Sequence, residues 1–186
     1  MAANMLYKNF KQMISEGSLT YCNKTVKLLD KKYGNSNDIV NYISCYMKVK
    51  YLSEISSAKE ILDTYSLEDE HLQNSLIQGL TLLKAECKIL IGDFDGAIKI
   101  LKFLLNVNSP QNVLCEIHYQ LGRAYLRKGA AFYQQAIDLL EGFLASDPEL
   151  LSAEISVDIL NVLGIVYLDS GKFHKAIYYF EKVIKS

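Results

Sequence analysis

The 186-residue sequence has no tryptophan, only 2 prolines, 10 glycines and no excess of charge of either sign. Its 20 basic and 21 acidic side chains leave a formal net charge of -1. Binding to a nucleic-acid backbone depends on a surplus of lysine and arginine, so this balance disfavours nucleic acid as a partner. With so few chain-breaking residues and no strands of alternating polar and apolar residues, the sequence predicts an all-α protein.

Long hydrophobic runs are also missing. Gly92, Asp93, Asn106 and Asp169 interrupt the apolar stretches well before the roughly 18 residues that a membrane-spanning helix needs. The first residues reach lysine before any apolar stretch develops, which argues against a secretory signal. We therefore expect no membrane association and a cytoplasmic or nuclear location.

Residues that could carry chemistry are scattered along the chain. The 4 cysteines form no CxxC pair and have no histidine at metal-ligand spacing. The three histidines, His71, His118 and His174, lie far from one another, and no glycine-rich phosphate-binding loop is present. We expect no catalytic residue, no cofactor and no metal, and hence a protein that is not an enzyme.

A repeat organises the apolar half of the sequence. The clearest copy is LNVLGIVYLDSGKFHKAIYYFEKVI, and the copy before it is HYQLGRAYLRKGAAFYQQAIDLLEGFLASDP, with looser copies toward the N-terminus. Five copies are predicted, at approximately residues 3–36, 39–72, 78–111, 115–148 and 157–186. They form a single array over residues 1–186, which we expect to be part of a longer one. A small residue marks the second helix of each copy, at Cys22, Ala58, Ala97, Ala136 and Ala176.

Small residues have two distinct purposes in these copies. Gly122 and Gly164 remove a side chain where the two helices of a copy cross, opposite the marker alanine of the second helix. A second set of glycines stands where the first helix must end, and glycine tolerates the left-handed conformation common there (Gly17, Gly92, Gly129 and Gly171). An aromatic residue three places before each marker alanine is expected to begin an apolar stripe that packs within the hairpin and onto the next one (Phe94, Tyr133 and Phe173).

These residues resemble the tetratricopeptide repeat (TPR), with Leu-Gly-x-x-Tyr in the first helix and Ala-x-x-x-Phe/Leu in the second. The resemblance is most specific over residues 115–186. It implies a TPR-like α-α superhelix of about five helical hairpins that acts as a protein-protein interaction scaffold. The intervals exceed the usual 34 residues, and the turn RKGAAFY is one place where the extra length lies.

In a TPR array the first helices line a concave groove, so the resemblance also implies a set of partner-binding positions. In this sequence they are Glu86, Tyr119, Arg123, Arg127, Asp158 and Asn161. Tyrosine and arginine are enriched at binding hot spots, which favours Tyr119 and Arg123. The alternative is that Arg123 and Arg127 only pair with Glu116 or Asp158.

The N-terminal half carries a narrower resemblance. NDIVNYISCYMKVKYLSEISSAKEIL followed by LLKAECKILIGDFDGAIKIL looks like the start of the TPR scaffold subunits of the anaphase-promoting complex. That resemblance implies a cell-cycle ubiquitin-ligase scaffold whose N-terminal repeats form a homodimer, with Leu6, Tyr7 and Phe10 as the first candidates for self-association.

The alternative is a TPR adaptor that binds a short peptide of a trafficking, import or chaperone partner in its concave groove. The Lys and Asn residues of a chaperone carboxylate clamp are absent from the corresponding positions, which include Tyr7, Ser44 and Gly79. A chaperone role of that type is therefore disfavoured.

Overall fold

The computed structural model describes residues 38–65, 75–107, 109, 111–146 and 153–185, and four single positions nearer the N-terminus (Lys24, Lys27, Leu28 and Lys31). The chain divides into two compact units, Met1–Ile91 and Gly92–Ser186. The boundary falls in the turn between the two helices of the third predicted copy. Apart from those four positions the first predicted copy, with Leu6, Tyr7, Phe10 and Gly17, lies outside the described residues.

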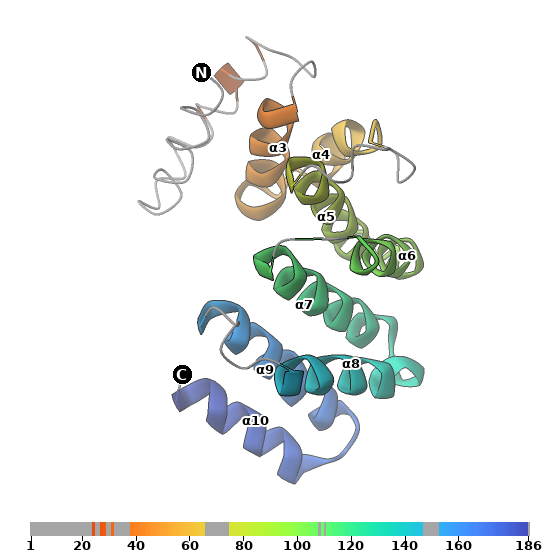
Figure 1. The fold of residues 1–186 in the computed structure, drawn as a ribbon, viewed down its shortest axis with the longest axis vertical. Coiled ribbons are helices and arrows are strands. Elements are labelled where there is room, and N and C mark those ends of the chain that lie inside the picture. Colours follow the sequence, from red (N-terminus) through yellow and green to blue (C-terminus); the bar gives the residue numbers. More distant parts are fainter. Residues whose placement is uncertain are drawn as a thin grey trace. The chain divides into compact units, whose positions relative to one another are not determined.

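The first unit contains three α-helices and a π-helical turn in its described part. They are α3 (Asp38–Met47), the π-helical turn Lys48–Leu52, α4 (Ile55–Leu62) and α5 (Ser75–Leu90) (Figure 1). Helix α5 packs against both α3 and α4. The core between them contains Ala58, which is fully buried, as its predicted place at a helix crossing requires. The other buried residues of this core are Cys45, Val49, Ile61, Leu62, Leu80, Leu83 and Cys87.

The described residues of the second unit form a run of five α-helices. They are α6 (Phe94–Leu105), α7 (Gln111–Lys128), α8 (Tyr133–Ser146), α9 (Ala153–Asp169) and α10 (Phe173–Lys185), with a 3-10 turn at Ala130–Phe132. Helix α7 packs against α6, α8 and α9, and α9 also packs against α8 and α10. Each first helix thus contacts the second helix before it and the second helix of its own copy, which is the neighbour stacking of a helical repeat.

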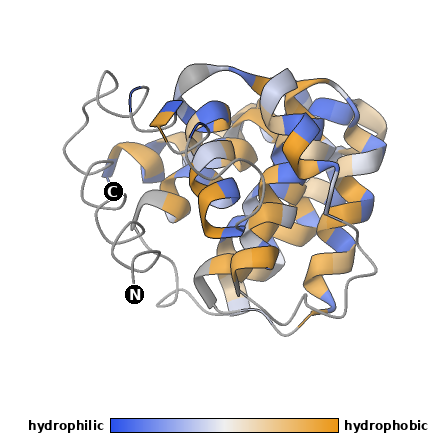
Figure 2. Ribbon diagram, turned by 90° about the horizontal axis from the view of Figure 1, so that it is seen from above, coloured by the Kyte–Doolittle hydropathy of each residue, from blue (hydrophilic) through white to orange (hydrophobic). Residues whose placement is uncertain are grey.

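Hydrophobic and hydrophilic residues lie on the same helices (Figure 2). In α8 and α10 the marker alanines Ala136 and Ala176 are buried, as predicted. A Cβ atom at Gly122 would lie 2.6 Å from Leu140 Cδ1, and one at Gly164 would lie 2.5 Å from Phe180 Cε1. These distances leave no room for a side chain, so the predicted close helix crossings are confirmed.

The turns between helices also follow the prediction, with one addition. Gly92, Gly129 and Gly171 have positive φ angles of 85°, 113° and 71°. Ser53, at the corresponding turn between α3 and α4, also has a positive φ, of 55°. The sequence offers no glycine there, so this left-handed conformation was not predicted. The longer turn RKGAAFY folds as the 3-10 turn, in which Phe132 stacks on Tyr125 with ring centroids 6.3 Å apart.

Two expectations need adjustment. Phe173 was expected to begin a packed stripe, but it is 61% exposed, so that prediction is wrong for Phe173. Phe94 and Tyr133, the corresponding residues of α6 and α8, are half-buried. Part of the extra repeat length lies in longer first helices, because α7 begins at Gln111 and α9 at Ala153, ahead of their predicted copies at 115 and 157.

Candidate functional site

Five of the six predicted partner-binding residues lie in the second unit, on two first helices that pack against each other. Tyr119, Arg123 and Arg127 follow one another at four-residue spacing and so share one face of α7. Asp158 and Asn161 lie on α9. Arg127 and Asn161 are exposed, and the other three are half-buried. We call these five residues, with the half-buried Glu116 of α7, the α7/α9 surface.

Hydrogen bonds along α7 hold the central arginine of this surface in place. The Arg123 Nη1 atom donates to Gln120 Oε1 at 3.1 Å, and Gln120 Nε2 donates to Glu116 Oε1 at 2.9 Å. Gln120 is fully buried, which fixes its amide between the two charged side chains. The guanidinium carbon of Arg123 lies 5.8 Å from the centroid of the Tyr119 ring, within cation-π range. The result is an oriented arginine beside an aromatic ring.

Gln120 is a buried residue of this surface that the sequence did not single out. The alternative named above was a pairing of Arg123 with Glu116, and the two side chains are here linked through the Gln120 amide. The sequence spacing indicates these contacts, because Gln120 lies four residues after Glu116 and three before Arg123. Side chains at these spacings are neighbours on one helix face.

Glu86, the sixth predicted residue, lies in the first unit. It is only 6% exposed, and its Oε1 atom lies 2.7 Å from the Lys50 Nζ atom. This ion pair ties the π-helical turn to α5. The carboxylate of Glu86 is thus engaged within the unit. A role of Glu86 in binding a partner stays a prediction.

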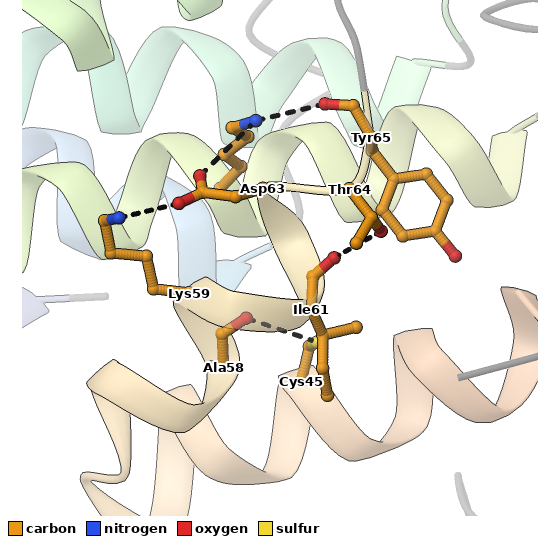
Figure 3. A network of polar contacts seen from close by, with 8 residues as sticks. Cys45, Ala58, Lys59, Ile61, Asp63, Thr64 and Tyr65 are labelled. Carbon is orange, nitrogen blue, oxygen red and sulfur yellow. Dashed lines mark hydrogen bonds and ion pairs between the residues drawn. The ribbon is translucent and has the colours of Figure 1, made fainter. Parts of the chain in front are cut away.

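A second polar network in the first unit connects α4 to α5. The Lys84 Nζ atom donates to the Tyr65 carbonyl at 3.0 Å and lies 3.5 Å from Asp63 Oδ1. Lys59 Nζ lies 2.6 Å from the other oxygen of Asp63 (Figure 3), and this hydrogen bond is the main reason that the pKa of Asp63 is lowered. Lys84 therefore fastens the end of α4 to α5.

A shared carboxylate joins three helices of the second unit. Glu141 Oε1 on α8 accepts hydrogen bonds from the Tyr167 hydroxyl of α9 at 2.6 Å and the Tyr179 hydroxyl of α10 at 2.7 Å. The two tyrosine rings stack with centroids 5.6 Å apart. Burial raises the pKa of both hydroxyl groups, and the adjacent carboxylate raises it further. We call these three residues the Glu141 cluster, and their arrangement is that of a structural contact.

The described histidines form no site for a metal ion. Among the residues that the structure describes, no three His, Cys, Asp or Glu side chains are grouped so that they could hold one. His118 instead stacks on Phe143 with centroids 4.0 Å apart, and its Nδ1 atom lies 2.8 Å from the Leu114 carbonyl oxygen. Burial lowers the pKa of His118. Within the same described part of the chain, every helix is too short or too polar to cross a membrane.

No protein-family model matches the chain, and no curated protein matches it. The chain is similar to a solved structure described as a MamA RS-1 ArsTM double mutant, a TPR-like protein. The match covers 98% of this chain and 93% of that chain, with a TM-score of 0.61 and 16% sequence identity. A likeness at this identity concerns the fold, and it confirms the prediction from the repeats: the chain is all-α, with the helical hairpins of a TPR-like α solenoid.

Proposed function

We propose that the chain is a non-enzymatic protein-interaction scaffold that binds a peptide segment of a partner protein at the α7/α9 surface. The observation that carries this proposal is the pairing of Tyr119 with an Arg123 side chain already held by Gln120. A few hot-spot residues dominate binding energy at protein interfaces, and tyrosine and arginine are enriched among them. A side chain that is ordered before binding loses less conformational entropy when the partner arrives.

The charges of the surface indicate the chemistry of the peptide. Arg123 and Arg127 on α7 suit carboxylate groups of the partner, which arginine can bind through two hydrogen bonds. Asp158 and Asn161 on α9 suit a hydrogen-bond donor or a basic side chain. A peptide with an acidic residue and a basic residue on either side of an apolar or aromatic side chain is complementary to this arrangement.

Selection of peptides from a random library against the whole chain tests the proposal. We expect the selected peptides to bind wild-type protein and to lose about tenfold or more in affinity to the Tyr119→Ala and Arg123→Ala variants, measured by fluorescence anisotropy. Lys99→Ala on α6 is the matched control, because Lys99 is an exposed basic residue on a second helix. Peptides that bind all four proteins equally would place the binding site elsewhere.

Two more specific functions differ in the partner that they require. The first is a subunit of the anaphase-promoting complex, which the N-terminal sequence resemblance supports. This function requires self-association through the segment that contains Leu6, Tyr7 and Phe10. Sedimentation equilibrium should then show a dimer that Phe10→Asp converts to a monomer. A wild-type monomer that retains peptide binding would favour the adaptor instead.

A further inference from the structure

The buried amide of Gln120 connects two opposite charges on α7. Its side chain is fully buried, and burying an amide costs free energy unless its polar atoms are hydrogen-bonded. The Nε2 atom donates to Glu116 Oε1 at 2.9 Å, and the Oε1 atom accepts from Arg123 Nη1 at 3.1 Å. Both ends of this amide are therefore used to join a carboxylate to a guanidinium.

The charges of the two partners allow this amide one orientation. The ionised carboxylate of Glu116 only accepts hydrogen bonds, and the guanidinium of Arg123 only donates them. An amide turned by half a rotation would set donor against donor and acceptor against acceptor, so both bonds would be lost. Glu116 thus fixes which end of Gln120 faces Arg123, and the low dielectric of a buried position strengthens both bonds.

A guanidinium held in this way is selective for the geometry of its ligand. The hydrogen bond to Gln120 and the Tyr119 ring, whose centroid lies 5.8 Å from the guanidinium carbon, both constrain the orientation of Arg123. Arginine binds a carboxylate through two parallel hydrogen bonds, which requires that the planar group faces the ligand correctly. A ligand amide has one oxygen and gains less from the same orientation.

On the basis of the function proposed for the α7/α9 surface, we propose that Gln120 and Glu116 are positioning residues that make this surface specific for a carboxylate of the bound peptide. Gln120 orients the Arg123 guanidinium directly. Glu116 acts through Gln120, because it fixes the direction of the amide. Specificity for the peptide then depends on a side chain that the peptide does not touch, since Gln120 is fully buried.

The test compares the binding of two peptides to each protein. The first is the tightest-binding peptide selected against the whole chain, and the second is the same peptide with every aspartate and glutamate replaced by its amide. We call the ratio of their dissociation constants, measured by fluorescence anisotropy, the carboxylate preference. It should be about tenfold or more for the wild-type protein. Loss of folded protein weakens both affinities equally, so this ratio does not depend on stability.

Gln120→Met removes the amide, keeps a side chain of similar size and changes no charge. The carboxylate preference should fall from about tenfold to about twofold, because Arg123 loses its acceptor. Gln134→Met is the matched control. The Gln134 Nε2 atom also donates to a carboxylate four residues away, Asp138 Oδ1 at 2.8 Å, but both side chains are exposed on α8. This control should keep the wild-type preference.

Glu116→Gln separates positioning from simple attraction between charges. The substitution removes a negative charge, so electrostatics alone predicts a stronger carboxylate preference. An amide at position 116 can donate as well as accept, so it no longer fixes the direction of the Gln120 amide. Positioning therefore predicts the opposite result, a preference about threefold or more below that of the wild type. Asp138→Asn, the matched control, should leave the preference unchanged.

Three results would overturn the positioning role. One is a wild-type protein that binds both peptides equally, or selected peptides without any acidic residue. Another is an unchanged preference in Gln120→Met, and the third is a preference in Glu116→Gln that equals or exceeds that of the wild type. If Gln120→Met does not fold, Glu116→Gln decides the question alone.

The Arg123→Ala variant separates these results from a failure of the proposed function. Loss of affinity in Arg123→Ala together with any of the three results would leave the function of the surface in place and remove only the positioning role. Equal binding by wild type and Arg123→Ala would remove the proposed function, and the positioning role with it.

Discussion

Glu141→Ala should be one of the most destabilising single substitutions among the partly exposed residues of the second unit. The substitution removes the acceptor of two hydrogen bonds, of 2.6 Å from Tyr167 and 2.7 Å from Tyr179. Both tyrosine residues are buried, so water cannot replace the lost partner without rearrangement. A hydrogen bond to a charged group contributes about 1.5 kcal/mol or more, so we expect a loss of about 3 kcal/mol in the free energy of unfolding. For a chain of this length the unfolding temperature should fall by about 6–12 °C.

Urea unfolding followed by circular dichroism measures the effect. Glu181→Ala is the control, because Glu181 is exposed on α10 and its Oε2 atom lies 3.8 Å from Lys185 Nζ. The loss of this exposed ion pair should change the free energy of unfolding by about 0.5 kcal/mol at most. The Tyr167→Phe and Tyr179→Phe variants, combined with Glu141→Ala in double-mutant cycles, apportion the loss. A loss below about 0.5 kcal/mol for Glu141→Ala, or cycles without coupling, would refute the reasoning.

Three further substitutions test the fold. Ala97→Arg should cost several kcal/mol, because Ala97 is fully buried and the longer side chain would overpack the crossing and bury a charge; an unchanged unfolding temperature would contradict the repeat register. Ser53→Gly should stabilise the chain by about 0.5–1 kcal/mol, because glycine has no penalty at a φ of 55°, and thermal unfolding measures the gain. The lowered pKa of His118 means that the unfolded chain binds more protons below pH 6.5, so stability should fall as the pH drops from about 6.5 toward the folded-state pKa. Urea unfolding at several pH values measures the free energy of unfolding of the wild type and of His118→Phe. Both proteins share the effect of carboxylate protonation, and only the wild type should show the further decline over that range.

The sequence predicts those parts of the fold that depend on local geometry. Ala136 and Ala176 are buried at the predicted helix crossings, and Gly122 and Gly164 lie where a side chain has no room. Each position permits only a small residue, so its identity carries the information. Ser53 shows the limit of this reasoning, since the turn geometry that glycine marks elsewhere is here adopted by a residue that does not indicate it.

The polar contacts could not be predicted in the same way. Glu141 is 26 residues from Tyr167 and 38 from Tyr179, so their meeting depends on how three helices stack. Gln120 is different, because its partners lie about one turn away on the same helix, at spacings that can be read from the sequence. Helical periodicity thus identifies partners along one helix, whereas partners across helices require the tertiary structure.

Periodicity also cannot distinguish a polar residue that holds the fold from one that meets a partner. Glu86 and Arg123 occupy equivalent positions of first helices, yet Glu86 is buried in an ion pair with Lys50, while Arg123 is half-buried beside the ring of Tyr119. Removal of Glu86 leaves the Lys50 ammonium without this carboxylate, so Glu86→Ala should reduce stability more than peptide affinity. Tyr119→Ala should reduce affinity more than stability, since its ring is partly open to solvent. The ratio of the two losses, rather than the position in the repeat, therefore separates a structural residue from a binding residue in this chain.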